Sequence, residues 1–180
     1  AAPPGARRSH SIAAVHGRTP SGPHGPFAAP GSLTVRLIVD GGGIERPLVV
    51  RLDPRVEISD SDLAMQTEYS MLTYDVYLEL QGMRDAVDAM LATDGLAADR
   101  RDALQQLRGS GVPGNPDITY GSMRAVPAES ESIVGLQSKF LFSLNILQSA
   151  DARPTKQAMR AVRALVELAD DLERRLQSLR

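Results

Sequence analysis

Apolar side chains recur every three or four residues over a long stretch of this chain, from Ser59 to Ala92. The large apolar positions in this stretch are Met65, Tyr69, Leu72, Val76, Leu80, Met83, Val87 and Met90. Their spacing matches the helical repeat of ~3.6 residues and predicts one helix about 50 Å long, at ~1.5 Å per residue. A helix of that length needs cover for its apolar stripe, so we expect partner helices beside it.

Two later segments have the same spacing and are the expected partners. The first begins at Ala128 or Glu129 and ends at Ser149, and the second runs from Thr155 to Ser178. The stripe of the first comprises Ile133, Leu136, Phe140, Leu144 and Leu147, widened by Val134, Leu141 and Ile146. We expect this first segment to be the most buried helix, and a shorter amphipathic helix over Leu96–Arg108.

The pattern changes from helical spacing to alternation over residues 32–56. Leu33, Val35, Leu37 and Val39 alternate with Thr34, Arg36, Ile38 and Asp40, which predicts a strand with one buried face. Gly41, Gly42 and Gly43 suit a hairpin turn, and Leu48, Val50 and Leu52 form the inner face of the return strand. Pro47 indicates an edge position or a bulge. A lone hairpin is marginal in water, so this one must pack on a helix or on strands outside the chain.

The expected fold is therefore mainly α. Residues 57–180 form an antiparallel helical bundle of three long helices plus one short helix, because short connections place neighbouring helices antiparallel. A β-hairpin from a truncated β-sandwich precedes the bundle. Residues 1–31 are rich in Ala, Gly, Pro, Ser, Arg and His, and we expect them to be disordered or extended.

Composition removes several classes of function. The net charge of −2 is too small to indicate nucleic acid or an anionic membrane as a partner. Aromatic residues make up only 4% and Trp is absent, which argues against sugar-binding and base-stacking surfaces. The chain has no Cys, and no apolar run reaches the ~20 residues of a membrane span. Ala1 indicates either a processed end or a cut through a longer chain, and the oligomeric state stays open.

Four groups of polar or aromatic residues are candidate sites, and each has a sufficient structural explanation. His10, His16 and His24 lack the fixed geometry of a metal site, and Asp53 with Arg55 suits a corner after the hairpin. The other two groups are the acidic residues Glu57, Asp60, Asp62 and Glu68 at a helix start, and the tyrosines Tyr69, Tyr74 and Tyr77.

The Gly-rich run over 109–116 does not change this picture. It lacks the Gly-Lys-Ser/Thr ending of a phosphate loop. We therefore assign no catalytic, cofactor-binding or metal-binding residue, and no cofactor.

One stretch carries a family resemblance. Residues 25–56 read GPFAAPGSLTVRLIVDGGGIERPLVVRLDPRV. They resemble the C-terminal region of large bacterial proteins of the sortilin-like, Asp-box (bacterial neuraminidase repeat) β-propeller family, in which such strands end a small β-sandwich domain. The stretches 121–129, 135–139 and 148–155 are similar to the helical region that follows, so the resemblance covers roughly residues 25–170.

The resemblance implies location in the periplasm or outside the cell, and a propeller that lies before residue 1. The Asp-box repeat itself, Ser-x-Asp-x-Gly-x-x-Trp, does not occur in this chain, so the resemblance transfers no catalytic residue. The first hypothesis is therefore a non-catalytic C-terminal accessory domain whose partners are the β-propeller and β-sandwich domains of the same parent chain. The alternatives are a free-standing helical interaction or dimerisation module, and an enzyme of the glycoside-hydrolase type acting through Glu/Asp pairs.

Overall fold

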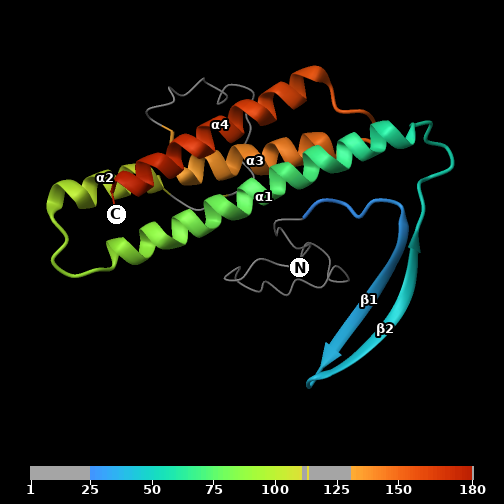
Figure 1. Ribbon diagram of the computed structural model, residues 1–180, viewed down its shortest axis with the longest axis horizontal. Coiled ribbons are helices and arrows are strands. Elements are labelled where there is room, and N and C mark those ends of the chain that lie inside the picture. The colour runs from blue at the N-terminus through green and yellow to red at the C-terminus, as the bar shows by residue number, and fades with distance from the viewer. Residues whose placement is uncertain (1–24, 111–112, 114–130, 180) are drawn as a thin grey trace, which may run out of the picture.

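A computed structural model describes residues 25–110, 113 and 131–179. Within them the chain is mainly α, with four helices and one two-stranded antiparallel sheet, as the spacing predicts (Figure 1). The elements are β1 (Gly31–Val39), β2 (Gly42–Val50), α1 (Asp60–Leu91), α2 (Ala98–Arg108), α3 (Ile133–Leu147) and α4 (Lys156–Ser178). We call the four helices together the helical body.

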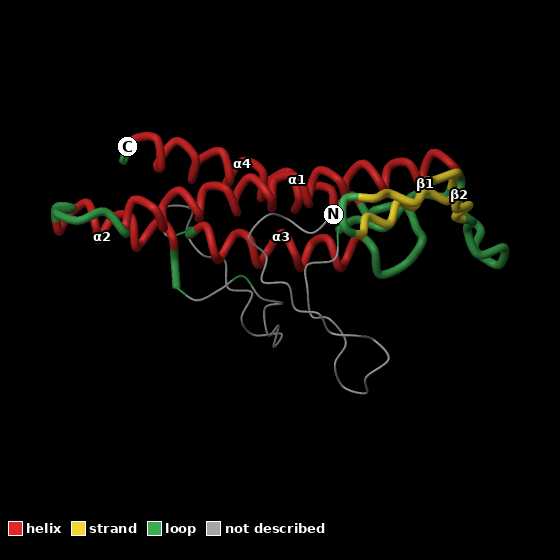
Figure 2. The backbone as a smooth tube through the Cα atoms, turned by 90° about the horizontal axis from the view of Figure 1, so that it is seen from below, coloured by secondary structure: helices red, strands yellow, loops and turns green. Residues whose placement is uncertain are grey.

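The helices α1, α3 and α4 lie side by side and contact one another (Figures 1 and 2). The chain direction of α3 is opposite to that of α1 and α4 (Figure 1). Helix α2 lies at one end of the helical body, and the hairpin leaves from the other end (Figure 2). Segments far apart in sequence therefore bury a shared core along the length of α1.

The core consists of two clusters of apolar side chains. The larger one, which includes the α2 end, contains Val76, Tyr77, Leu80, Val87, Leu104, Leu107, Ile133, Leu136, Phe140, Ala169, Leu172 and Leu176. The smaller one contains Tyr69, Leu147 and Val162. Phe140 and Leu80 are fully buried. Helix α3 buries seven of its fifteen residues, in keeping with its long apolar stripe.

Local capping fixes where three of the helices begin. The side chains of Ser59, Ser132 and Thr155 accept the backbone N–H of the residue three positions later, which satisfies one free donor of the first turn. The prediction of a start at 128 or 129 for α3 is wrong, because Ser132 is extended and caps a helix that begins at Ile133. Residues 128–130 themselves lie outside the described part of the chain.

The buried face of α1 differs from the predicted stripe in its first half. Leu72 is exposed, while Gln66, Ser70 and Thr73 are buried. In α3, Ile146 was expected to widen the apolar stripe but is also exposed. Both differences have one reason: spacing identifies a helical stripe, but the positions of α3 and α4 decide which edge of that stripe is covered.

The hairpin has a regular register without a bulge. Val39 pairs with Gly42, and the pairs continue to Gly31 with Val50, so β2 ends two residues before Leu52. The turn is Asp40–Gly41 rather than the predicted glycine run, and both residues have positive φ, at 50° and 81°. An Asp-Gly pair with two positive φ values is the preferred two-residue turn between strands. Pro47 lies opposite Thr34 in an edge strand, which is the edge alternative of the prediction.

Candidate functional site

One face of the hairpin carries large apolar side chains along most of its length, and Arg46 interrupts them opposite Val35. Every second residue of each strand points to the same side, and the register aligns Leu37 with Ile44 and Leu33 with Leu48. We define the apolar face as Leu33, Val35, Leu37, Val39, Ile44 and Leu48. These side chains are 39% to 59% exposed. The expectation of a buried face is therefore wrong within the described residues, because the hairpin extends away from the helical body (Figure 1).

The opposite face of the hairpin is mixed in character. Thr34, Arg36 and Glu45 lie there, together with the exposed side chains of Ile38 and Val49. Arg36 and Glu45 face each other across the strands and form an ion pair. A cross-strand pair of opposite charges in water suits a solvent-facing surface. The apolar face has six exposed apolar side chains beside Arg46, whereas the opposite face has two, Ile38 and Val49, beside its ion pair. Contact with another surface is therefore favoured at the apolar face.

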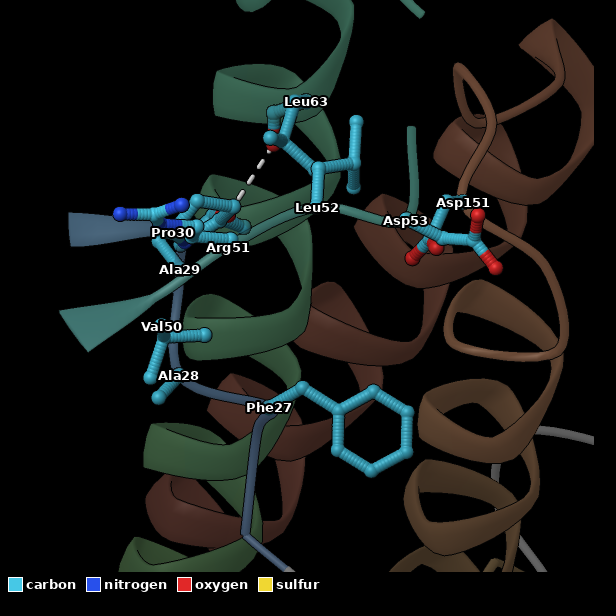
Figure 3. A pocket seen from close by; sticks show the side chains of 11 residues that line it. Phe27, Ala28, Ala29, Pro30, Val50, Arg51, Leu52, Asp53, Leu63 and Asp151 are labelled. Carbon is cyan, nitrogen blue, oxygen red and sulfur yellow. Dashed lines mark hydrogen bonds between the residues drawn. The ribbon is translucent and has the colours of Figure 1, made fainter. Parts of the chain in front are cut away.

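A small cavity of about 180 Å³ lies where the hairpin meets the helical body (Figure 3). Its lining comes from residues 27–30, the end of β2 and the turn after it, the first turns of α1, and Asp151. Pockets for small-molecule ligands usually enclose ~300–1,000 Å³. The backbone N–H of Phe27 donates to the side chain of Gln148 at 2.7 Å, which fastens the chain beside this cavity. We interpret the cavity as the joint between hairpin and helices.

Asp53 and Arg55 form the corner between β2 and α1, as the turn interpretation predicts. Arg55 donates to the Asp53 carboxylate from its backbone N–H at 2.9 Å and from Nη2 at 2.6 Å. The Arg55 side chain, and to a smaller extent its backbone N–H, lowers the pKa of Asp53 below its ordinary value. Because folding lowers this pKa, the pair contributes stability that is fully present above the unfolded-state pKa. This contribution is lost as the pH falls through the folded-state pKa.

Replacing Arg55 tests this assignment directly. We expect Arg55→Ala to raise the pKa of Asp53 toward its ordinary value, because the charged donors that favour the carboxylate are removed. A pH titration of the Asp53 carboxyl carbon by NMR measures the change. Arg51→Ala, two residues before Asp53, is the matched control and should leave the pKa of Asp53 unchanged. An unchanged pKa in Arg55→Ala would contradict the assignment.

The acidic residues near the start of α1 lie at the helix end, in an ion pair or in solvent. Asp60 and Asp62 lie in the first turn of the helix, where carboxylates favour the positive end of its dipole. Asp62 also faces Arg153, with Oδ1 at 3.4 Å from Nη1. Glu57 and Glu68 are exposed. This arrangement gives every one of the four carboxylates water, a helix end or a cation as its environment.

The three tyrosines contribute to packing at two places along α1. The hydroxyl of Tyr69 accepts a hydrogen bond of 2.6 Å from Arg163 of α4, whose guanidinium also lies 5.7 Å from the centre of the Tyr69 ring. Tyr74 and Tyr77 stack with their ring centres 6.3 Å apart. Burial raises the pKa of the Tyr77 hydroxyl. Tyr69 belongs to the smaller core cluster and Tyr77 to the larger one, so the three rings do not line one cage.

The helical body also buries several polar side chains, which the sequence pattern missed. The amide nitrogen of Gln66 donates to the carbonyl oxygens of Leu147 and Ala150, both at 2.6 Å, and so caps the end of α3. The Thr73 hydroxyl donates to the carbonyl of Tyr69 at 2.7 Å. Gln137 is fully buried in α3, and neither atom of its amide has a hydrogen-bond partner within the described structure.

The remaining candidates carry no described site. His10, His16, His24 and most of the Gly-rich run lie outside the described residues. In residues 25–110, 113 and 131–179, no group of three His, Cys, Asp or Glu side chains is placed to hold a metal ion. No helix in the same ranges is long and apolar enough to cross a membrane. Comparisons with protein-family models, curated proteins and solved structures find no match.

Proposed function

We propose that this chain is a non-catalytic accessory domain of a larger exported β-propeller protein, and that it attaches to a β-sheet of that protein through the apolar face of its hairpin. The observation that carries the proposal is the uncovered apolar face itself. Burying apolar surface contributes ~25 cal/mol per Å², so six adjacent exposed apolar side chains strongly favour contact with another surface. The attached unit is an antiparallel bundle of three long helices and one short helix.

The size of the apolar face favours a partner within the same polypeptide. Two nine-residue strands cover about 30 by 10 Å, given ~3.3 Å per residue and ~4.8 Å between strands. Contact over this face would bury about 600 Å² in total, below the ~1,000 Å² expected of a stable complex between separate molecules. A partner in the same chain is held at an effective concentration in the mM range, so the smaller contact suffices.

The same estimate weighs against the first alternative, a free-standing dimerisation module. Two copies meeting at their apolar faces would have only this small contact to hold them. We therefore expect the isolated 180-residue chain to sediment as a monomer at micromolar concentration. The second alternative, a glycoside hydrolase, requires two carboxylates that face each other across a cleft. The carboxylates weighed from the sequence have helix ends, cations or water as their environment, and they offer that alternative no support.

A cysteine-labelling experiment tests the proposed function. The chain has no Cys, so Val35→Cys introduces a single thiol on the apolar face with little change in volume. Thr34→Cys introduces one on the opposite face, one residue away. The rate of reaction with a maleimide is measured for both variants in the isolated chain and in the full-length polypeptide, after replacement of any other Cys by Ser.

We expect both thiols to react rapidly in the isolated chain. In the full-length polypeptide the thiol at position 35 should become protected, because a sheet covers the apolar face, while the thiol at position 34 stays reactive. Equal reactivity at position 35 in both forms would overturn the proposed function. So would the finding that the 180 residues are the whole polypeptide, since no tethered partner would then exist. A dimer of the isolated chain that Leu37→Lys dissociates would favour the dimerisation module instead.

A further inference from the structure

The two edges of the hairpin differ in the backbone groups that they offer. The pair that closes a two-residue turn of this type is hydrogen-bonded, and bonded and non-bonded pairs then alternate along an antiparallel ladder. Val39 and Gly42 close the turn, so the pairs of Leu37 with Ile44 and of Leu33 with Leu48 are bonded as well. The residues of the other pairs direct their backbone N–H and C=O groups outward. On β1 these are Ser32, Thr34, Arg36 and Ile38; on β2 they are Gly43, Glu45, Pro47 and Val49.

Pro47 interrupts the outer edge of β2. It has no N–H to donate, and its ring occupies the place where a neighbouring strand would approach. The outer edge of β1 has an N–H at each of its four outward positions, because none of them is proline. The sequence thus blocks one edge of the hairpin and leaves the other continuous. An unpaired continuous edge is a template for another strand.

We propose that the outer edge of β1 pairs with the edge strand of one sheet of the same polypeptide, so that the hairpin extends that sheet and β2 becomes its new outer edge, and that a second sheet packed on the first covers the apolar face. This inference rests on the proposed function and adds which edge of the hairpin attaches. The partner is a pair of packed β-sheets of the same polypeptide, of which one has an open edge and the other presents an exposed apolar layer. Main-chain hydrogen bonds hold the strand, and the apolar face closes over the apolar layer.

A second copy of the chain fits these observations less well. Pairing of two β1 edges would join the two apolar faces into one wider uncovered face, since both lie on the same side of the joined sheet. Pairing of two apolar faces would leave both β1 edges open and bury only about 600 Å². Two packed sheets in the same polypeptide satisfy the edge and the face together.

Proline substitutions on the two edges test the inference in the full-length polypeptide. Thr34→Pro removes one outward N–H from β1, at the rung where β2 already has Pro47. Val49→Pro removes one from β2 and is the matched control. Neither change removes a hydrogen bond within the hairpin, because both N–H groups point outward. Each is combined with Val35→Cys, and the maleimide reaction rate is divided by that of the same variant in the isolated chain.

We expect Thr34→Pro to raise the normalised rate about tenfold or more, since one hydrogen bond is lost and the proline ring obstructs its neighbours. Val49→Pro should leave the rate unchanged. A raised rate in Val49→Pro, or in neither variant, would overturn the inference about β1. The proposed function would still stand if position 35 is protected in the parent polypeptide. An unprotected position 35 in the parent polypeptide would overturn both.

Amide hydrogen exchange measured by NMR provides a test without substitutions. In the full-length polypeptide the amides of Thr34, Arg36 and Ile38 should exchange slowly, and those of Glu45 and Val49 rapidly. All five should exchange rapidly in the isolated chain, because both edges then face water. Slow exchange confined to the β2 amides would contradict the inference, even if a proline variant failed to fold.

Discussion

Phe140→Ala is expected to lower the free energy of unfolding by about 3–5 kcal/mol. Phe140 is fully buried in α3 and belongs to the main core cluster, which joins residues of all four helices. Removing the ring takes away apolar burial and leaves a cavity that close-packed neighbours fill only in part. Urea denaturation followed by circular dichroism at 222 nm measures the loss, and a single shared transition would indicate that the helices unfold as one unit.

Ile146→Ala is the matched control for this prediction. It removes an aliphatic side chain of the same helix that is 47% exposed. Its expected cost is within about 0.5 kcal/mol, as for most surface substitutions. A similar loss for both variants would contradict the assignment of the buried face of α3. A cost of less than about 0.5 kcal/mol for Phe140→Ala would contradict the core itself.

Gln137→Leu is expected to raise the free energy of unfolding by about 1–3 kcal/mol. Gln137 has no exposed surface, and its amide oxygen and nitrogen lack partners among the described residues. A buried polar group without a hydrogen bond loses its contacts with water and gains nothing in return. Leu has a similar size and keeps the site filled, so the change removes the penalty without opening a cavity. The same urea titration measures the gain.

Gln66→Leu is the control, because it alters the same residue type in a different setting. Gln66 donates to two carbonyl groups at the end of α3, so its removal leaves buried acceptors unpaired. We expect a loss of about 1–3 kcal/mol. The two substitutions should therefore change stability in opposite directions. A loss in Gln137→Leu comparable to that in Gln66→Leu would contradict the prediction.

Features that depend on near neighbours in the chain were predictable from the sequence. The stretches predicted to be helical from Ser59 and from Thr155 begin with these residues as the caps of α1 and α4, since a cap needs only the next three residues. The corner of Asp53 and Arg55 forms for the same reason. Alternation predicts the hairpin strands, but the predicted turn lies one residue late, because each residue of the glycine run tolerates the positive φ of a turn.

The sequence predicted which residues form the apolar face but not that the face is exposed. Alternation identified which side chains share a face, because strand geometry dictates it. Whether that face is covered depends on surfaces far away in the sequence, and the described helices do not cover it. The distinction between the β1 and β2 edges needed the register as well, since only the pairing of Thr34 with Pro47 shows which way the missing N–H would point.

By itself the sequence determined the helical stripes and the two faces of the hairpin, because each follows from residues within a few positions of one another. Only the tertiary structure decided that Thr73 and not Leu72 enters the core, that Gln137 is sealed there without a partner, and that the hairpin stands away from the helices. The reason is that burial is a property of packed elements. Local spacing defines a stripe or a face, but distant segments decide which part of it leaves water.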